Sequence, residues 1–580
     1  MNEIKQVEKI RHSLAHLLAI EVLKFDPEAK LAIGPTIENG FYYDFEFSEG
    51  KIPTEAELKQ FKKGIKKSIS SNLEFTCEKI DADKAREIFT NQPYKLEMIE
   101  ELATADSEIS IYRTGDFVDL CAGTHVENSK EINVDAFDLN KIAGAFWRGD
   151  ENNKMLTRIY GVAFETKEEF NEYQNWLEEA ATRDHRKIGK EMGLWTFSDL
   201  VGAGLPMFTP KGTIIRNALK NKLFKISNKY GAQEVTIPHL AKRKLYETSG
   251  HADKFGDELL TVHSHYDEFI LKPVNCPHHT QIFASEPRSY KDLPVRFIES
   301  TMQYRDEKPG EIGGLTRVRA ITVDDGHTFC TPDQIKEEAG NIAKIIEEFY
   351  TDLGLYGNHW VSLSVRDSKN KDGYIGTDEN WDKAETMLQE VSNELKLEAK
   401  VVEGEAAIYG PKLDFMFKDS LGRETQLATI QLDFNMPARF ELEYTDSDGT
   451  KKTPVMIHRA ILGSYERFMA ILIEHFAGNF PTWISPVQVK ILPIAEPHHK
   501  KACEILELLK ENEIRADLDI SKDSLGKKVR NAKKEKVPYY IIIGDKDIVE
   551  NKITIESRDD GNLGMMTVEE FIEKIREEIK

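Results

Sequence analysis

The pattern of apolar and polar residues divides the chain into stretches of different character. Residues 1–160 mix short strand-like and helix-like runs. The next stretch, "TKEEFNEYQNWLEEAATRDHRKIGKEMGL", reads as a single charged helix, and Thr166 and Glu169 have the spacing of a capping box at its start. Apolar side chains recur along it at helical spacing, at Phe170, Tyr173, Leu177 and Ala180. A charged helix between two irregular regions predicts a connector.

The largest block, from about 185 to 482, begins with an amphipathic helix and continues as strands. The helix is "GTIIRNALKNKLFKISNKYG", and strand-like runs such as "QEVTIP", "PVRFIES" and "LATIQLDF" follow it, with a hairpin turn at "SDGT". One face of the helix carries Ile215, Leu219, Leu223 and Ile226. This pattern predicts an antiparallel sheet. The last hundred residues alternate strand, helix, strand, helix, strand, which predicts a small α/β domain with a mostly parallel sheet.

Composition narrows the class of protein. The 580 residues are 40% hydrophobic, no run is long and apolar enough for a membrane span, and the first residues lack the apolar core of a secretory signal. Five scattered cysteines indicate a reducing compartment. The net charge of −22 argues against non-specific binding to nucleic acid, but residues 522–536 hold seven basic and two acidic side chains. That patch is either a solvated helix face or a phosphate-contacting surface.

Two pairs of residues near the start share a spacing of four. His12 and His16 lie in the helix-like "RHSLAHLLA", on the same helical face. Cys121 and His125 repeat the spacing in "DLCAGTH". Three histidines and a cysteine suit zinc, and ligand chemistry alone favours it. The alternative is a set of hydrogen-bonding groups arranged for another purpose.

The densest chemical signal lies in "STMQYRDEKPGEIGGLTRVRAITVDDGHTFC". Arg305 and Glu307 precede a Gly/Pro-containing loop that leads to Arg317. A strand–loop–strand that holds arginines in this way can clamp a polyphosphate, because the guanidinium is planar and permanently charged. The alternative is a surface hairpin with ordinary ion pairs. Arg467 follows in "GSYERF", and neither a Walker loop nor a convincing dinucleotide fingerprint is present.

These residues resemble class II aminoacyl-tRNA synthetases. "YRDE" and "GSYERF" look like motifs 2 and 3 of that class, and the helix ending near "TIPHL" looks like motif 1, which forms its dimer interface. Within the class, "HSLAHLL", "DLCAGTHV", "LKPVNCPHH", "YGPKLDF" and "IHRAILGSYERF" resemble the threonyl family, in the right order and over essentially the whole chain. The resemblance implies an α+β multidomain protein: an editing domain at 1–163, a linker helix at 164–184, a class II catalytic domain built on an antiparallel sheet at 185–482 and an anticodon-binding domain at 483–580.

The resemblance also implies roles in ATP binding. Arg305 would bind the α-phosphate, Glu307 the adenine amine and Arg317 the γ-phosphate, while Arg467 would stack on adenine or hold phosphate. Mg²⁺ would accompany ATP.

The family places one catalytic zinc ion on a cysteine and two histidines, which match Cys276, His327 and His458. Three protein ligands leave an open position, in which threonine would bind through its amine and hydroxyl. Asp325 matches the acid that holds the hydroxyl. Further residues implied in the amino-acid pocket are Tyr409, Gln431 and Lys412, the last read on the same strand as Tyr409.

Serine, which lacks only a methyl group, requires a second sieve, because one methyl distinguishes substrates by only about 10–200-fold. The cluster of His12, His16, Cys121 and His125 resembles the family's editing site for mischarged seryl-tRNA. In the family that site works without a metal, which makes zinc the less favoured interpretation of this cluster. His12 would position or deprotonate a water molecule. Tyr43, Lys95 and Asp119 would shape the pocket, with Lys95 stabilising charge or activating water.

Three features depart from the family pattern. Only eleven residues precede His12, so the small ubiquitin-like domain of many members is expected to be absent. Ile321 and Val323 replace an aromatic residue and a glutamine, and the loss of the aromatic ring predicts weaker stacking on adenine. Lys522 and Glu556 stand where anticodon-contacting Asn and Arg are common, and we hypothesise that Arg558 replaces the lost cation from the same strand face.

The expected partners are ATP, threonine and threonine tRNA, in a cytoplasmic homodimer. Three alternatives are an inactive synthetase-like RNA-binding or regulatory protein, a free-standing zinc hydrolase, and a synthetase whose editing site has decayed. Arg305, Arg467 and the three zinc-ligand candidates are all present, which disfavours the first. The second leaves most of the chain unexplained, and the complete N-terminal cluster argues against the third.

Overall fold

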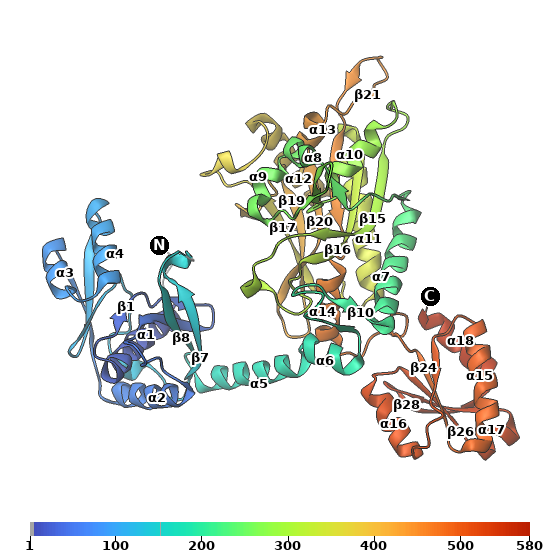
Figure 1. Ribbon diagram of the computed structural model, residues 1–580, viewed down its shortest axis with the longest axis horizontal. Helices are drawn as coiled ribbons and strands as arrows, with labels where there is room; N and C mark the ends of the chain where they lie inside the picture. Colours follow the sequence, from blue (N-terminus) through green and yellow to red (C-terminus); the bar gives the residue numbers. More distant parts are fainter. Residues whose placement is uncertain (1–4, 151, 580) are drawn as a thin grey trace. The chain divides into compact units, whose positions relative to one another are not determined.

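The computed structural model describes residues 5–150 and 152–579. The chain divides into two compact units, one up to Glu178 and one from Glu179 onward (Figure 1). In the first unit, α1 (Gln6–Phe25) packs on an antiparallel sheet and on α2 (Glu55–Ser70). The sheet contains, in spatial order, β1 (Lys30–Leu31), β3 (Gly40–Glu46), β8 (Met155–Ala163) and β7 (Phe137–Phe146), with β2 (Thr36–Ile37) also paired to β3. Leu14, Leu17 and Leu18 of α1 are fully buried, as its helical apolar spacing requires.

A second, smaller sheet of this unit carries the other half of the N-terminal cluster. Its strands are β4 (Phe75–Ile80), β5 (Ile109–Thr114) and β6 (Phe117–Leu120), and they pair antiparallel. The helices α3 (Ala82–Ile88) and α4 (Pro93–Thr104) bury a separate apolar core against it. Because β6 ends at Leu120, Cys121 begins the loop that follows it.

The predicted connector is two helices rather than one. Helix α5 (Lys167–Arg183) begins with the predicted capping box, in which Glu169 N–H donates to Thr166 Oγ1. It ends before Asp184, whose backbone is non-helical (φ −50°, ψ 119°) and whose side chain accepts from Arg186 N–H to start α6 (His185–Met192). The single-helix prediction is therefore wrong, because Asp184 acts as an N-cap.

The second unit is built on a long, mainly antiparallel sheet. In spatial order its strands are β11 (Gln233–Glu234), β15 (Val295–Tyr304), β16 (Ala320–Cys330), β23 (Val455–Ala460), β20 (Glu424–Asp433), β19 (Lys412–Lys418), β17 (His359–Val365) and β18 (Lys400–Glu403). The outer pairs β11/β15 and β17/β18 are parallel. Of the strand predicted at "QEVTIP", only Gln233–Glu234 forms, as β11. The hairpin predicted at "SDGT" forms between β21 (Tyr444–Thr445) and β22 (Lys451–Lys452).

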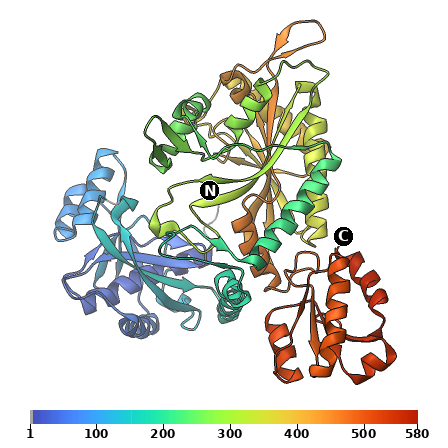
Figure 2. The ribbon, with the colours of Figure 1, turned by 45° about the vertical axis from the view of Figure 1, so that its right-hand side comes forward.

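Helices cover one face of this sheet and leave the other to the site. Helix α7 (Pro210–Lys229) packs beside α11 (Ile335–Asp352) (Figure 2), and the predicted face of α7 is buried in the largest core. The same core includes α12 (Asp378–Glu394) and α14 (Tyr465–Phe476). On the opposite side, α10 (Cys276–Ala284) packs with α8 (Arg243–Ser249), next to α9 (His251–Phe255).

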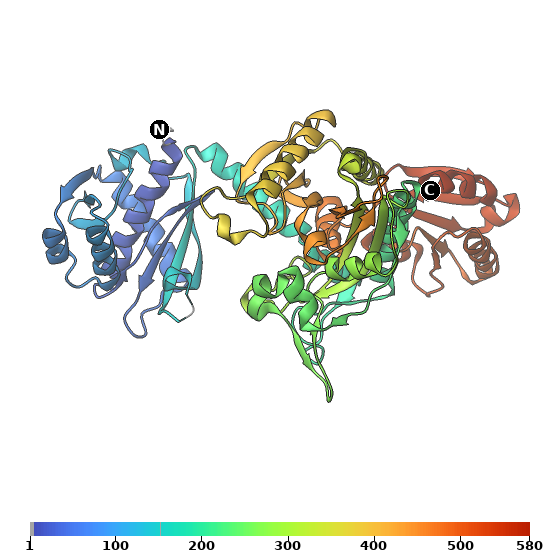
Figure 3. The same cartoon turned by 90° about the horizontal axis from the view of Figure 1, so that it is seen from above.

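The C-terminal part is an α/β sheet as predicted. Its strand order is β25 (Ala516–Leu518), β24 (Val489–Pro493), β26 (Tyr539–Ile543), β27 (Ile553–Ser557) and β28 (Gly561–Met566). The expectation of a mostly parallel sheet is wrong, because β27 and β28 pair antiparallel and only β25, β24 and β26 are parallel. Helices α15 (His499–Glu511) and α18 (Val568–Ile579) bury one face of the sheet. Helix α16 (Leu525–Lys534) covers the other face (Figure 3).

Candidate functional site

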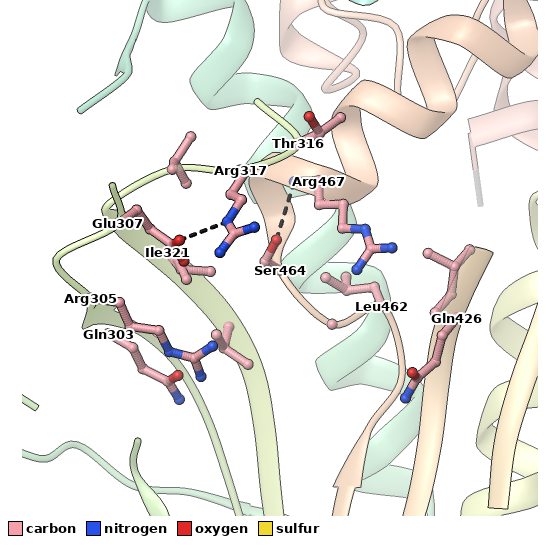
Figure 4. Close-up of a pocket in the computed structure, with 14 residues that line it drawn as sticks. Gln303, Arg305, Glu307, Thr316, Arg317, Ile321, Gln426, Leu462, Ser464 and Arg467 are labelled. Carbon is pink, nitrogen blue, oxygen red and sulfur yellow. Dashed lines mark hydrogen bonds and ion pairs between the residues drawn. The ribbon is translucent and has the colours of Figure 1, made fainter. Parts of the chain in front are cut away.

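A cavity of about 450 Å³ opens on the exposed face of the central sheet. Arg305 follows directly on β15, Arg317 lies in the loop before β16, and Arg467 lies in the first turn of α14, whose N-cap Ser464 accepts from Arg467 N–H at 3.2 Å. Figure 4 shows these arginines on separate segments around the cavity. Glu307, Ile321 and Val323 also line it. Three segments distant in sequence therefore bring their cations to one hollow.

Some of the charged side chains around the cavity already form ion pairs with one another. Arg317 Nε lies 2.6 Å from Glu307 Oε2, and the same guanidinium contacts Glu311 at 2.7 Å. Arg305 lies over the Phe255 ring, and its buried Nε has no hydrogen-bond partner among the described residues. Burial lowers the pKa of the Arg305 and Arg467 side chains. A buried donor without a partner is costly, so this end of the cavity favours an anionic ligand.

The wall of the cavity where adenine is predicted to bind is aliphatic. Ile321 and Val323 line the cavity, and no aromatic ring is among its described lining residues. Two amides, Gln303 and Gln426, complete the wall. In the view of Figure 4, Gln426 faces Arg305 from the opposite side.

Cys276, His327 and His458 meet at one point. Cys276 begins α10, His327 lies on β16 and His458 on β23, where the strand register places the two histidines directly opposite each other. One ligand atom from each residue lies within 4.8 Å of the others, and all three side chains are buried. His327 Nδ1 lies 2.7 Å from His279 Nδ1, and His458 Nε2 lies 2.9 Å from Asp433. A thiol and two imidazoles, with partners that orient the rings, fit a zinc ion with an open position.

The predicted amino-acid pocket surrounds this cluster. Asp325 accepts from Asn275 Nδ2 at 3.0 Å and lies 3.6 Å from His327 Nε2. The Tyr409 hydroxyl donates to Gln431 at 2.6 Å, and its ring stacks on His458 with centroids 4.5 Å apart.

Lys412 is held by a neighbour on its own strand. Its ammonium lies 2.9 Å from Asp414, whose carboxylate also accepts from Gln426, a residue that lines the cavity. One part of the prediction is wrong: Tyr409 lies in the turn before β19, not on the same strand as Lys412.

Several residues near the cluster were missed by the sequence reasoning. His251 is buried with Nε2 4.0 Å from Cys276 Sγ, and burial lowers its pKa to about 3. Asn275, His279 and Asp433 contact predicted residues as described above. His279 had a visible signal, since it closes the quoted "NCPHH". Asn275 opens the same stretch and Asp433 lies in the quoted "LATIQLDF", whereas His251 carries no local pattern that marks it.

The N-terminal cluster also assembles. His12 and His16 lie on one face of α1, and Cys121 and His125 come from the loop after β6. Cys121 Sγ lies 3.3 Å from both His12 Nε2 and His125 Nε2. Ser13 was missed: its hydroxyl contacts His125 Nδ1 at 3.2 Å.

The N-terminal cluster is neutral in character. Burial lowers the pKa of all three imidazoles and raises that of Cys121 to about 12. The thiol is therefore protonated near neutral pH.

Lys95 is buried in an ion pair. Its Nζ lies 2.6 Å from Asp119, and both side chains are almost inaccessible. Asp119 also accepts from the Tyr43 hydroxyl at 2.6 Å and lies 3.5 Å from His16 Nε2. Lys95 therefore neutralises Asp119 and orders the wall of the cluster.

The expectation for Arg558 is wrong, and one cation of the basic patch is structural. Lys528 is buried and donates to backbone carbonyls, so one of the seven cations is structural. Arg558 lies beyond the end of β27, and its guanidinium binds Asp559 and the carbonyls of Lys536 and Phe480. It cannot replace a cation beside Glu556. Lys533 of α16 is there instead, 3.6 Å from that carboxylate.

No helix in residues 5–150 and 152–579 has the length and apolar character needed to cross a membrane.

Comparisons with known proteins match all three parts. Residues 260–476 match the tRNA synthetase class II core domain (G, H, P, S and T), 488–578 the anticodon binding domain, and 109–160 the threonyl and alanyl tRNA synthetase second additional domain. The threonine–tRNA ligase of Gloeobacter violaceus is 45% identical over 99% of this chain and 93% of its own length. That of Cytophaga hutchinsonii is 46% identical over 98% and 88%.

Solved structures of threonyl-tRNA synthetases also resemble this chain. The RNA binding domain of threonyl-tRNA synthetase from Cryptosporidium parvum Iowa II has a TM-score of 0.65 and 33% identity, covering 68% of this chain and 98% of its own. A putative threonyl-tRNA synthetase from Aeropyrum pernix has a TM-score of 0.61 and 28% identity, covering 68% and 94%. These matches confirm the predicted resemblance and fold class. The chain belongs to the threonine–tRNA ligase family of class II aminoacyl-tRNA synthetases.

Proposed function

We propose that the chain activates threonine with ATP, transfers it to threonine tRNA and hydrolyses mischarged seryl-tRNA. One observation carries the synthetic part. On β16, Ile321 and Val323 line the arginine cavity, whereas His327 belongs to the cysteine–histidine cluster and Asp325 lies beside it. Residues two apart on a strand share a face. A single strand face thus runs from the nucleotide cavity to the amino-acid pocket, over about 20 Å at ~3.3 Å per residue.

This arrangement suits adenylate formation. The carboxylate of threonine attacks the α-phosphorus of ATP, the bond to the bridging oxygen breaks, and pyrophosphate leaves with the electron pair. Arg305, whose buried Nε has no partner in the part of the chain that the structure describes, is placed for the α-phosphate, and Arg317 and Arg467 for the rest of the nucleotide. Preorganised cations stabilise the charge that develops in the transition state. Glu307 would turn from Arg317 to the adenine amine, and Mg²⁺ would enter with ATP.

Cys276, His327 and His458 would hold one zinc ion. When bound, zinc supplies a Lewis-acidic centre with room for an amine and a hydroxyl. Around that position, Asp325 presents a carboxylate for the hydroxyl, held by Asn275, and the Tyr409–Gln431 pair closes the wall. A site built to bind a hydroxyl rejects valine by about 10⁴–10⁵-fold.

The N-terminal cluster would hydrolyse seryl-tRNA. Since burial lowers the pKa of His12, its imidazole is neutral and can accept a proton from water. The thiol of Cys121 and the imidazole of His125 surround the same point.

We also propose a homodimer that acts on tRNA in the cytoplasm. The loop between β9 (Trp195–Thr196) and β10 (Met207–Phe208) exposes Phe197, Leu200 and Val201, an apolar surface that a second subunit would cover. Sedimentation equilibrium would test this, and a monomer would refute it.

The decisive experiment is ATP–pyrophosphate exchange with threonine, serine and valine in turn. We expect strong exchange with threonine, weaker exchange with serine and negligible exchange with valine. Robust exchange with valine would contradict the recognition argument, and no exchange with any of them would favour an inactive RNA-binding protein. Deacylation of seryl-tRNA should be lost in His12→Ala, with threonine-dependent exchange as the internal control.

A further inference from the structure

His185 joins the two segments that carry Arg317 and Arg467. It is the first residue of α6 and is buried outside the cavity. Its Nδ1 lies 2.6 Å from Glu474 Oε1 on α14, and its Nε2 accepts the backbone N–H of Leu315 at 3.2 Å. Glu474 lies two turns along α14 from Arg467, and Leu315 lies two residues before Arg317.

The two partners specify one form of the ring. A backbone N–H can only donate, so Nε2 must be the acceptor. A carboxylate accepts, so Nδ1 must carry the proton. Both nitrogens are therefore engaged in the neutral Nδ1–H tautomer. The backbone N–H of His185 also donates to Glu474 at 3.2 Å, which fixes the start of α6 to the same carboxylate.

The loop before β16 is seated directly on this ring. Gly314 has a φ of +54°, and a Cβ there would lie 2.3 Å from His185 Nε2. Leu315 is fully buried, which prevents the loop from shifting outward. Both residues lie inside a tight turn, in which Gly313 N–H donates to the Arg317 carbonyl at 3.2 Å. The imidazole thus supports the base of the turn whose top presents Thr316 and Arg317 to the cavity.

The same residues are close enough to suggest a metal site, but their bonding argues against one. Asp184, His185 and Glu474 place ligand atoms within 4.8 Å of one another. Asp184 is paired with Arg186, Glu474 with Arg423, and both nitrogens of His185 are engaged. A cation would have to displace an arginine already in place.

We infer that His185 is a positioning residue for ATP: through Leu315 it sets the loop that presents Arg317, and Glu474 holds it in the required tautomer. The inference rests on the proposed role of the cavity as the nucleotide site. Its effect reaches the phosphate end of the cavity and not the amino-acid pocket, because none of the residues described around Cys276 contacts this loop.

The test uses two substitutions that each keep half of the ring's bonding. In His185→Gln, the longer side chain can still present an acceptor to Leu315. In His185→Asn, the shorter side chain can still donate to Glu474 but cannot reach Leu315. ATP–pyrophosphate exchange of the full chain should show a KM for ATP raised roughly fivefold in His185→Asn, the equivalent of one hydrogen bond. The KM for threonine should stay within about twofold, and His185→Gln should restore the KM for ATP.

Further variants keep the result interpretable. Lys187→Ala, an exposed position on α6, should behave as wild type. If His185→Asn does not fold, Glu474→Met, which has about the same length but no oxygen to accept from Nδ1–H, should show the same selective rise in the KM for ATP. Equal changes in both KM values, or no rescue by glutamine, would overturn the inference. Arg317→Ala separates the two proposals: an unchanged KM for ATP there refutes the cavity assignment, whereas a rise there without one in His185→Asn refutes only the role of His185.

Discussion

The buried Lys95–Asp119 pair allows a test of how burial changes the contribution of an ion pair to the stability of the fold. In Lys95→Met, Asp119 would keep the Tyr43 hydroxyl but lose its only close cation among the described side chains. Leaving one partner of a buried pair uncompensated costs about 3–5 kcal/mol. The Tyr43 hydrogen bond offsets part of this, so we expect about 3 kcal/mol of lost stability in the first unit.

Hydrogen exchange with mass spectrometry on the full chain measures this locally. Peptides from α1 and from β5–β6 should exchange about 100-fold faster in Lys95→Met, since each 1.36 kcal/mol is about tenfold. The Lys79–Glu108 pair of the same unit is a matched control, with a similar distance of 2.7 Å but side chains 68% and 66% exposed. Lys79→Met should leave exchange unchanged, because solvent already screens that pair.

A double variant checks the cause. Lys95→Met with Asp119→Asn removes both charges, and its cost should be smaller than the sum of the single costs by about 1–3 kcal/mol. Seryl-tRNA hydrolysis should be lost in either single variant, while threonine-dependent exchange is retained. If Lys95→Met exchanges no faster than Lys79→Met, the reasoning from burial is refuted.

Three further outcomes are expected. Purified protein should contain about one zinc per chain by elemental analysis, lost in Cys276→Ser and kept in Cys121→Ser; two per chain would place a metal in the N-terminal cluster. Iodoacetamide near neutral pH should label the exposed Cys77 and Cys503 well before Cys121, whose pKa burial raises to about 12; mass spectrometry of tryptic peptides would show the reverse order if that thiol were ionised. Burial lowers the pKa of Lys272 to about 8. Between about pH 8 and about pH 10.4, the unfolded chain therefore binds a proton at this lysine that the folded chain does not. The free energy of unfolding should rise with pH over this range, by up to about 1.4 kcal/mol per pH unit. Lys272→Met, compared with wild type by urea unfolding at the two ends of this range, should lack that contribution, and equal slopes would contradict it.

Structural features that depend on residues close together in the sequence were predicted well. The buried face of α7, the capping box of α5 and the strand–helix alternation of the C-terminal part all follow from local spacing, and the structure confirms them. The break at Asp184 was missed although Asp is a favoured N-cap. Charged helical periodicity continues across it, and the contact that fixes the break, from His185 to Glu474, joins residues 289 apart.

Surface charge was predicted less well, because charge in a sequence does not reveal what each side chain bonds. Lys528 and Arg558 are both basic residues near the proposed RNA surface, yet each donates to backbone carbonyls. The cation beside Glu556 is Lys533, which comes from a helix packed over the sheet. Strand spacing alone could only compare Glu556 with its neighbours on β27.

The candidate zinc cluster shows why family resemblance found what spacing could not. Cys276, His327 and His458 come from a helix start and two strands, and their meeting depends on the register of β16 against β23. That register places His327 opposite His458, and β20 then places Gln431 opposite His458 from the other side. A slip of one residue between β16 and β23 would turn His327 to the helix-covered face and bring the neighbouring Thr328 or Gly326 toward the pocket. The same slip would carry Ile321 and Val323 out of the cavity, because they share the face of His327. Nucleotide cavity and amino-acid pocket are therefore aligned by one register, and substitutions that disturb the β16/β23 pairing should impair ATP binding and zinc content together.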